Sequence, residues 1–85
     1  MAFVSEYYNN ATKFTLNNKG YLVNDNLCGC YNCLKIFSPK LINQWIKDEN
    51  GTAICPYCNV DSVIGESSGY PITREFLSDL RRGMF

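Results

Sequence analysis

The chain of 85 residues contains no histidine, so no imidazole is available as a general base or as a metal ligand. Its eight basic residues balance eight acidic ones, which leaves little of the basic surface that sequence-independent nucleic-acid binding requires. No apolar run approaches the ~20 residues that a membrane-spanning helix needs. The chain also begins without the basic and then apolar segment of a secretory signal, so we expect a soluble protein of the cytoplasm.

What the chain does have is cysteine in a regular pattern. Four of its five cysteines form two C-x-x-C pairs, one at residues 30–33 and the other at residues 55–58. We expect these four to bind one structural Zn²⁺ ion: Cys30, Cys33, Cys55 and Cys58. In each C-x-x-C turn two thiolates can converge on one ion while backbone amides point at the sulfurs. Because four thiolates fill a tetrahedral site, no position is left for water or substrate, and we expect no catalytic role for the metal.

The same cysteines allow other interpretations. Disulfides would need an oxidising compartment, which the missing signal sequence argues against, and an odd number of cysteines cannot pair completely. The second pair, Cys-Pro-Tyr-Cys, matches the redox dithiol of glutaredoxins, but the segment that follows it, 59–85, is too short for the framework of that fold. Cys28 is left over, either as a small buried apolar residue or as a competitor of Cys30 for the metal.

The short chain makes the metal energetically important. We expect one zinc-binding domain, residues 1–85, whose hydrophobic core alone is worth only ~3–5 kcal/mol. Structural zinc contributes on the order of 10–16 kcal/mol of apparent binding free energy, realised largely as folding. The metal-free chain should therefore be unfolded or loosened.

Hydrophobic periodicity predicts a helix within residues 1–20. Ser5 can cap its start, and Gly20 suits a left-handed residue at its end. Its apolar face would hold Val4, Tyr7, Tyr8, Ala11 and Phe14. Residues 21–23 are expected to follow as a short extended piece.

Two further helices are expected. The last spans residues 72–83, with an inward face of Phe76, Leu77 and Leu80. In the middle of the chain, Ser38-Pro39 is typical of a helix start, because serine caps and proline needs no donor in the first turn. That helix would end at residues 50–51, after burying Leu41, Ile42, Trp45 and Ile46 on one face.

Short strands at residues 34–37, 52–54 and 60–64 are expected to flank the cysteine pairs. Together these elements predict a small α+β fold. Residues 28–64 would form a zinc-ribbon-like or treble-clef-like metal core, flanked by two to three helices.

Aromatic side chains near the cysteines could form a surface on which bases stack, or a minimal core. We expect Phe37 and Trp45 to lie in the core. Tyr31 and Tyr57 occupy equivalent positions inside the two C-x-x-C pairs, and we expect both to project outward, where they could meet a partner.

Two polar groups are explained without a special function. Three arginines of the last helix are interrupted by acidic residues, so we expect a solvated surface at Arg74, Arg81 and Arg82. A serine with neighbouring acids, as at Asp61, Ser62 and Glu66, invites a catalytic interpretation. No base is identifiable nearby, so capping or turn hydrogen bonds are the better explanation for these residues.

The cysteine pairs resemble those of zinc-ribbon and treble-clef proteins, over roughly residues 28–63. More specifically, residues 33–39, 52–58, 60–65 and 68–73 resemble a family of small bacterial cytoplasmic proteins, and the likeness covers about two thirds of the chain. Asn59 stands where such turns often have glycine, and asparagine tolerates the same left-handed backbone. The resemblance implies a zinc site and no particular activity.

These observations favour a binding module over an enzyme. The leading hypothesis is a non-enzymatic protein that presents a surface to another protein, as an inhibitor, an immunity protein or a regulatory adaptor does. The second is a nucleic-acid-binding zinc ribbon associated with transcription, which the balanced charge does not favour. The third is a thiol oxidoreductase that acts through residues 55–58.

Overall fold

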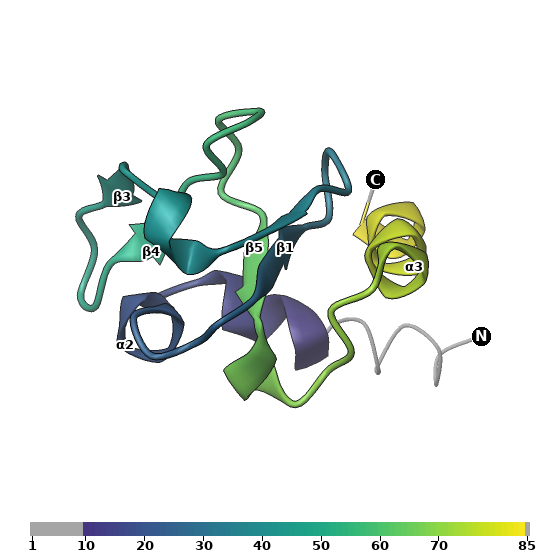
Figure 1. The fold of residues 1–85 in the computed structure, drawn as a ribbon, viewed down its shortest axis with the longest axis horizontal. Coiled ribbons are helices and arrows are strands. Elements are labelled where there is room, and N and C mark those ends of the chain that lie inside the picture. Colours follow the sequence, from purple (N-terminus) through teal and green to yellow (C-terminus); the bar gives the residue numbers. More distant parts are fainter. Residues whose placement is uncertain (1–9, 85) are drawn as a thin grey trace.

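A three-stranded antiparallel sheet lies at the centre of the computed structural model, which describes residues 10–84 (Figure 1). The strands are β1 (Cys28–Cys30), β2 (Ile36–Phe37) and β5 (Val63–Gly65), in the order β2–β1–β5. Every residue of β1 and β5 is buried. The sheet therefore forms the interior of the molecule, and the first cysteine pair begins on its central strand.

The core divides between the two faces of this sheet, because successive side chains of a strand point to opposite sides. In β5, Val63 belongs to one buried cluster and Ile64 to the other. The first cluster contains the cysteines together with Leu22, Phe37, Ile42 and Ala53. The second contains Ala11, Tyr31, Phe76, Leu77 and Leu80.

The C-terminal helix is confirmed. Helix α3 (Arg74–Met84) covers the second cluster, and the Thr73 side-chain oxygen accepts a hydrogen bond from the Phe76 amide at 3.1 Å, which caps the helix start. Its three predicted inward residues are all buried: Phe76, Leu77 and Leu80. Gly29 in β1 lets this helix come close, since a Cβ there would lie 2.6 Å from the Leu77 side chain.

The predicted helix after Ser38 is wrong beyond its first turn. Ser38 does cap the chain, accepting a hydrogen bond from the Lys40 amide at 3.3 Å, but only a single 3-10 turn follows, η2 (Pro39–Leu41). The chain then enters a hairpin of β3 (Trp45–Ile46) and β4 (Thr52–Ala53), at the opposite end of the molecule from α3 (Figure 1). Trp45 pairs with Ala53, and this pairing overrides the helical pattern.

Two other expectations for the middle segment have different outcomes. Leu41 and Ile46 are not buried on a common face, since they are 51% and 40% exposed. The turn at residues 50–51 is confirmed, because Gly51 adopts a φ of 89° between β3 and β4. The Gly51 amide donates to the Asp48 carboxylate at 2.7 Å, which closes the hairpin.

The N-terminal helix ends earlier than predicted. Residues 10–12 are helical, and a 3-10 turn, η1 (Lys13–Thr15), ends this stretch. Gly20 does not end a helix but lies inside another, α2 (Lys19–Leu22), and the left-handed residue is Asn17, with a φ of 51°. The expected extended piece at residues 21–23 is therefore wrong. Ala11 is fully buried, whereas Val4, Ser5, Tyr7 and Tyr8 lie outside the described residues.

Asn18 explains why the chain turns into α2 where it does. Its buried side-chain amide donates to the carbonyls of Phe14 and Val63 at 3.0 and 2.9 Å, and its oxygen accepts from the Ala53 amide at 3.0 Å. One side chain thus connects η1, β5 and β4. Within residues 10–84, no helix is long and apolar enough to cross a membrane.

Candidate metal centre

The first cysteine turn (residues 30–35) connects β1 to β2. The Cys30 amide donates to the Lys35 carbonyl at 3.0 Å, and the Leu34 amide donates to the Cys30 carbonyl at 2.8 Å. The Asn32 and Cys33 amides point at the Cys30 sulfur, at 3.3 and 3.5 Å. Leu34 closes the turn with a φ of 66°, an unusual conformation for a residue with a branched apolar side chain.

The second cysteine turn (residues 55–60) repeats this geometry between β4 and β5. The Cys55 amide donates to the Val60 carbonyl at 2.9 Å, and the Asn59 amide donates to the Cys55 carbonyl at 2.9 Å. The Tyr57 amide lies 3.4 Å from the Cys55 sulfur. Asn59 has a φ of 63°, so asparagine does take the left-handed conformation at this position.

The two turns face each other and bring four sulfurs together. The sulfurs lie within 4.8 Å of one another and belong to Cys30, Cys33, Cys55 and Cys58. The Cys30 sulfur is 3.6 Å from that of Cys58, and the Cys33 sulfur is 3.7 Å from that of Cys55. In a tetrahedral site with zinc–sulfur bonds of ~2.3 Å, sulfurs are about 3.8 Å apart. The cluster could therefore hold one metal ion.

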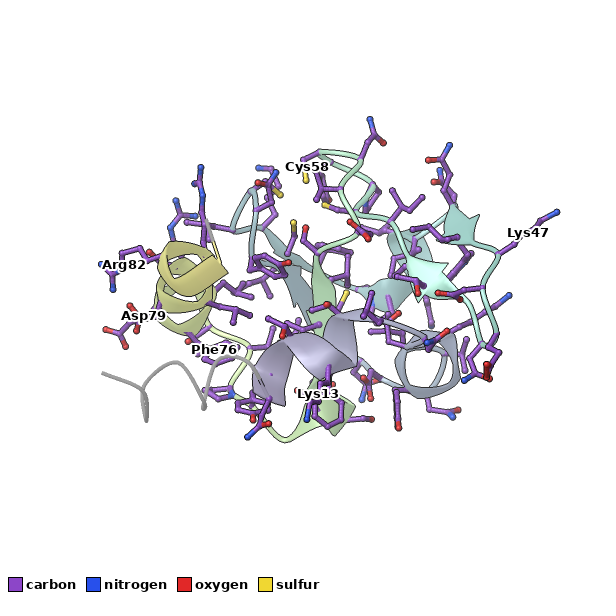
Figure 2. The ribbon with its side chains drawn as sticks, turned by 180° about the vertical axis from the view of Figure 1, so that it is seen from behind. Lys13, Lys47, Cys58, Phe76, Asp79 and Arg82 are labelled. Carbon is purple, nitrogen blue, oxygen red and sulfur yellow. The ribbon has the colours of Figure 1, made fainter. Side chains whose placement is uncertain are left out.

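None of these sulfurs is in a disulfide, since all five cysteines are free and a disulfide bond would bring two sulfurs to about 2.05 Å. The nearest sulfur pairs also join one turn to the other instead of closing either C-x-x-C turn on itself. An ion at the centre would thus connect the two turns. Figure 2 shows Cys58 at the edge of the molecule, where its turn meets solvent.

Burial and hydrogen bonding have opposite effects on the pKa values of the cysteine thiols. Burial raises the pKa of the Cys30 and Cys55 thiols, so their charge requires a nearby cation. Burial also acts to raise the pKa of Cys58, but hydrogen bonds from the Asn32 side chain and the Val60 backbone amide outweigh it and lower that pKa to about 7. A bound metal ion would supply the positive charge that keeps buried thiolates ionised.

Two polar residues around the sulfurs were not predicted as part of the site. The Ser62 hydroxyl is fully buried and lies 2.9 Å from the Cys30 sulfur. The Asn32 side chain reaches across from the first turn to the Cys58 sulfur at 3.4 Å. The Asn32 amide donates to its sulfur, the Ser62 hydroxyl can donate to a Cys30 thiolate, and such outer partners orient metal ligands. The only sequence feature that could have indicated their role is their position, Asn32 inside the first cysteine turn and Ser62 just after the second.

The structure decides between the two interpretations of Cys28. Its sulfur is fully buried, lies outside the four-sulfur cluster and is 3.4 Å from the Phe37 carbonyl. Burial, with a contribution from Asp25, raises the pKa of Cys28 to about 12. Cys28 is therefore a protonated thiol that packs as a small apolar side chain.

The two tyrosines inside the cysteine turns are not equivalent in their surroundings. Tyr57 projects outward as predicted, with 51% exposure, and its ring stands edge-on to Phe37 at a centroid distance of 5.4 Å. The outward prediction for Tyr31 is wrong, because its side chain is only 9% exposed and belongs to the cluster under α3. The difference arises because Tyr31, in the first turn, packs with residues of α3, whereas Tyr57 does not belong to that cluster. Phe37 is buried as predicted, and Trp45 is half-buried.

Glu66 and Arg82 have ordinary structural contacts. The Glu66 carboxylate accepts hydrogen bonds from the amides of Asn26 and Leu27, both at 2.9 Å, so the predicted turn bonding is present there. Arg82 forms an ion pair with Asp79, and both project from α3 into solvent (Figure 2). These contacts agree with turn bonding at Glu66 and with a solvated surface at Arg82.

The chain is thus a small α+β protein with short antiparallel strands and a cluster of four cysteines that could hold a metal ion. No protein-family model, curated protein or solved structure matches it, so its resemblance to small bacterial cytoplasmic proteins finds no support there.

Proposed function

We propose that this protein is a non-enzymatic binding module, held together by one structural Zn²⁺ ion, whose partner is another protein. The observation that carries this proposal is the closed arrangement of four sulfurs in two equivalent turns: Cys30, Cys33, Cys55 and Cys58. Four thiolates leave no open coordination position, so the ion would organise the fold without binding a substrate. An inhibitor, an immunity protein or a regulatory adaptor fits this description.

Zinc is the metal that this donor set favours. Tetrahedral thiolate sites select zinc or iron, and hard cations prefer oxygen ligands. Each cysteine pair lies in a turn between strands, an arrangement that supports a zinc-ribbon-like core more than a treble-clef-like one. Thiolates remain reduced in the cytoplasm, the compartment that we propose for this protein.

Metal analysis of freshly purified protein tests the first half of the proposal. We expect one zinc per chain by native mass spectrometry, with loss of the ion in Cys33→Ser and Cys58→Ser. The matched control is Cys28→Ala, which should retain one zinc, because Cys28 lies outside the cluster. A protein that is fully folded without any metal would refute the zinc module. Detection of one iron per chain would show that the site holds iron and not zinc.

A second candidate function is binding of single-stranded nucleic acid. It is favoured by a shallow pocket beside the second cysteine turn, lined by Tyr57, Lys35 and Arg74 among others. The Lys35 ammonium lies 5.4 Å from the centre of the Tyr57 ring, so an exposed aromatic face and two positive charges occur together. Bases stack on such rings, while cations contact the backbone. The balanced overall charge keeps a protein partner ahead.

Salt dependence separates these two functions. Nucleic-acid binding would show micromolar affinity for an oligonucleotide, a steep loss of affinity as salt rises, and a further loss in Tyr57→Ala. We expect none of these for a protein-binding module. Micromolar, salt-sensitive binding would reverse the order of the two proposals.

A further inference from the structure

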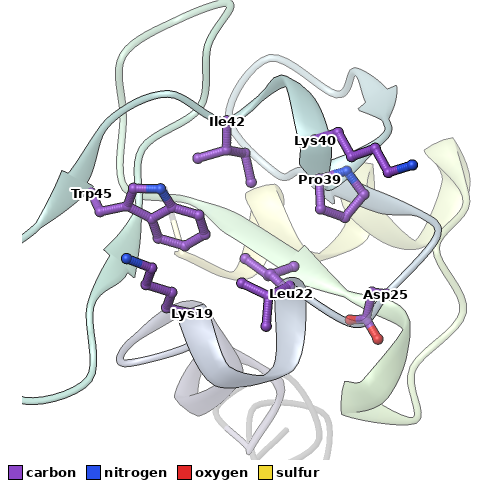
Figure 3. A pocket seen from close by; sticks show the side chains of 8 residues that line it. Lys19, Leu22, Asp25, Pro39, Lys40, Ile42 and Trp45 are labelled. Atoms are coloured by element: carbon purple, nitrogen blue, oxygen red, sulfur yellow. The ribbon is translucent and has the colours of Figure 1, made fainter.

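A pocket of about 290 Å³ opens between α2 and the segment that joins the two cysteine turns (Figure 3). One wall comes from α2 and the turn after it, with Lys19, Leu22, Val23 and Asp25. The other wall comes from η2 and the start of the hairpin, with Pro39, Lys40, Ile42 and Trp45. The volume lies just below the range of ~300–1,000 Å³ typical of small-molecule sites. It suits one large side chain better than a cofactor.

The floor of the pocket is apolar. Leu22 and Ile42 belong to the buried cluster that also contains the cysteines, and Trp45 packs against this cluster. At the rim, Val23 exposes 62% of its surface. A buried apolar floor with an exposed apolar rim is typical of a position where a partner inserts a hydrophobic anchor.

The charge at the rim is positive. Lys19 and Lys40 both line the pocket, and neither has an acidic partner within salt-bridge distance among residues 10–84. The Lys19 ammonium lies 5.4 Å from the centre of the Trp45 ring. The lining also contains one carboxylate, Asp25, which accepts hydrogen bonds from the Ser67 amide at 3.2 Å and from the Ser67 hydroxyl. The two lysines outnumber this one carboxylate, so the rim has an excess of positive charge.

We propose that this pocket is the docking site for a segment of another protein that inserts one aromatic or large aliphatic side chain flanked by carboxylates. The apolar floor would take the side chain, and Lys19 and Lys40 would pair with the acidic neighbours. The inference rests on the proposed function, since it names where a protein-binding module holds its partner and what chemistry that partner has.

Docking is also coupled to the metal centre. The wall with Pro39, Ile42 and Trp45 lies within the loop between Cys33 and Cys55, and both ends of this loop are held at the sulfur cluster. Removing the ion releases these ends and restores the conformational entropy of the loop. Partner and metal therefore stabilise one another, because coupling between two sites is reciprocal.

Trp45 is the sole tryptophan, so its fluorescence reports on the pocket directly. Zinc-loaded protein is titrated with three capped pentapeptides that have glycine at both ends. The first has phenylalanine between two aspartates, the second has phenylalanine between two lysines, and the third has alanine between two aspartates. We expect the first to bind at least about tenfold more tightly than either of the others, which requires both the apolar anchor and the charge.

Variants assign the binding to this pocket. Lys40→Glu and Val23→Asp both change exposed residues, so the fold should survive, and each should weaken binding of the first peptide about tenfold or more. The matched control is Lys47→Glu, since Lys47 is exposed, points into solvent and does not line the pocket (Figure 2). Isothermal titration calorimetry gives a second readout, and circular dichroism with zinc analysis checks each variant. Chelation of the metal should abolish binding.

Several results would overturn the docking site. These are equal affinity for the acidic and basic peptides, no binding of the first peptide at millimolar concentration, or phenylacetate binding as tightly as the peptide, which would indicate a small-molecule site.

Failure of the broader proposal, a module that binds another protein, would give a different result. A photo-cross-linking residue at position 23 should capture the physiological protein partner. Capture only from position 57 would refute the pocket and leave the binding module standing, and capture of nucleic acid would refute both.

Discussion

Single residues carry much of the local geometry of this protein through unusual backbone conformations and buried hydrogen bonds. The left-handed residues Leu34 and Asn59 occupy the same position in the two cysteine turns, directly after the second cysteine. Only the asparagine could be predicted from the sequence, because leucine rarely adopts this conformation. Repetition of one turn geometry around two cysteine pairs imposes it on Leu34.

The cost of the left-handed position can be measured at Asn59, which is exposed. We expect Asn59→Ala to lower the free energy of unfolding by ~0.5–1 kcal/mol and Asn59→Gly to leave it unchanged or raise it slightly, since glycine has no Cβ to clash. Denaturant titrations of zinc-loaded protein measure both. Asn43→Ala is the control, because Asn43 is exposed and has a negative φ. An equal effect of Asn59→Ala and Asn43→Ala would contradict the explanation.

Asn18 is the residue that the sequence offered least reason to single out. Its side chain satisfies the carbonyls of Phe14 and Val63 and the Ala53 amide. Asn18→Ala leaves these groups without partners and should lower the free energy of unfolding by roughly 2–4 kcal/mol. Asn24→Ala, in an exposed turn, should change it by less than ~0.5 kcal/mol. Similar values for the two variants in denaturant melts would show that the buried network contributes little.

At the scale of elements, some local signals predicted the structure, whereas the pairing of strands and the packing of distant elements could not be predicted from neighbouring residues. Helix α3, the Ser38 cap and the turn at Gly51 follow from neighbouring residues. The β3–β4 hairpin replaced a predicted helix because its strands gain backbone partners in each other. Tyr31 is buried because α3, at the far end of the chain, folds back over it.

Substitutions at two glycines of these elements should change the stability of the protein in opposite directions. Gly51 has a φ of 89°, and a Cβ there would lie 3.1 Å from the Lys19 side chain, so Gly51→Ala should destabilise the protein by ~1–2 kcal/mol. Gly20 lies inside α2 with nothing within 4 Å of an added Cβ, so Gly20→Ala should stabilise it by ~0.4–1 kcal/mol. Thermal unfolding of the two variants gives the signs. Destabilisation by Gly20→Ala would instead support a left-handed helix end there.

At the scale of the whole molecule, the sulfur cluster joins segments that are far apart in the sequence. The first turn extends the central sheet, and the second follows the β3–β4 hairpin. An ion bound between them would close the loop from Cys33 to Cys55 and stabilise both clusters of the core. This arrangement explains how so short a chain could maintain a folded core.

Removing the metal should therefore abolish cooperative unfolding. We expect excess chelator to eliminate the near-ultraviolet circular dichroism of the aromatic residues, and added zinc to restore it. Acid should have the same effect, because protons compete for the thiolates: the unfolded chain binds more protons at these sulfurs than the metal-bound fold, so stability falls as pH falls. Cys28→Ala should behave like the parent protein in both titrations. An unchanged spectrum in chelator would exclude a structural role for the metal.

By itself, the sequence determined the elements whose causes are local. The spacing within each C-x-x-C pair produces a turn whose amides face the sulfurs, and apolar periodicity produces α3. Only the tertiary structure decided which strands pair, that Cys28 stays outside the sulfur cluster, and that Tyr31 is buried while Tyr57 is not. It also decided that α2 and the segment between the cysteine turns enclose a pocket. The reason is physical: such contacts join residues far apart in the chain, and their free energy exists only once the chain has folded around them.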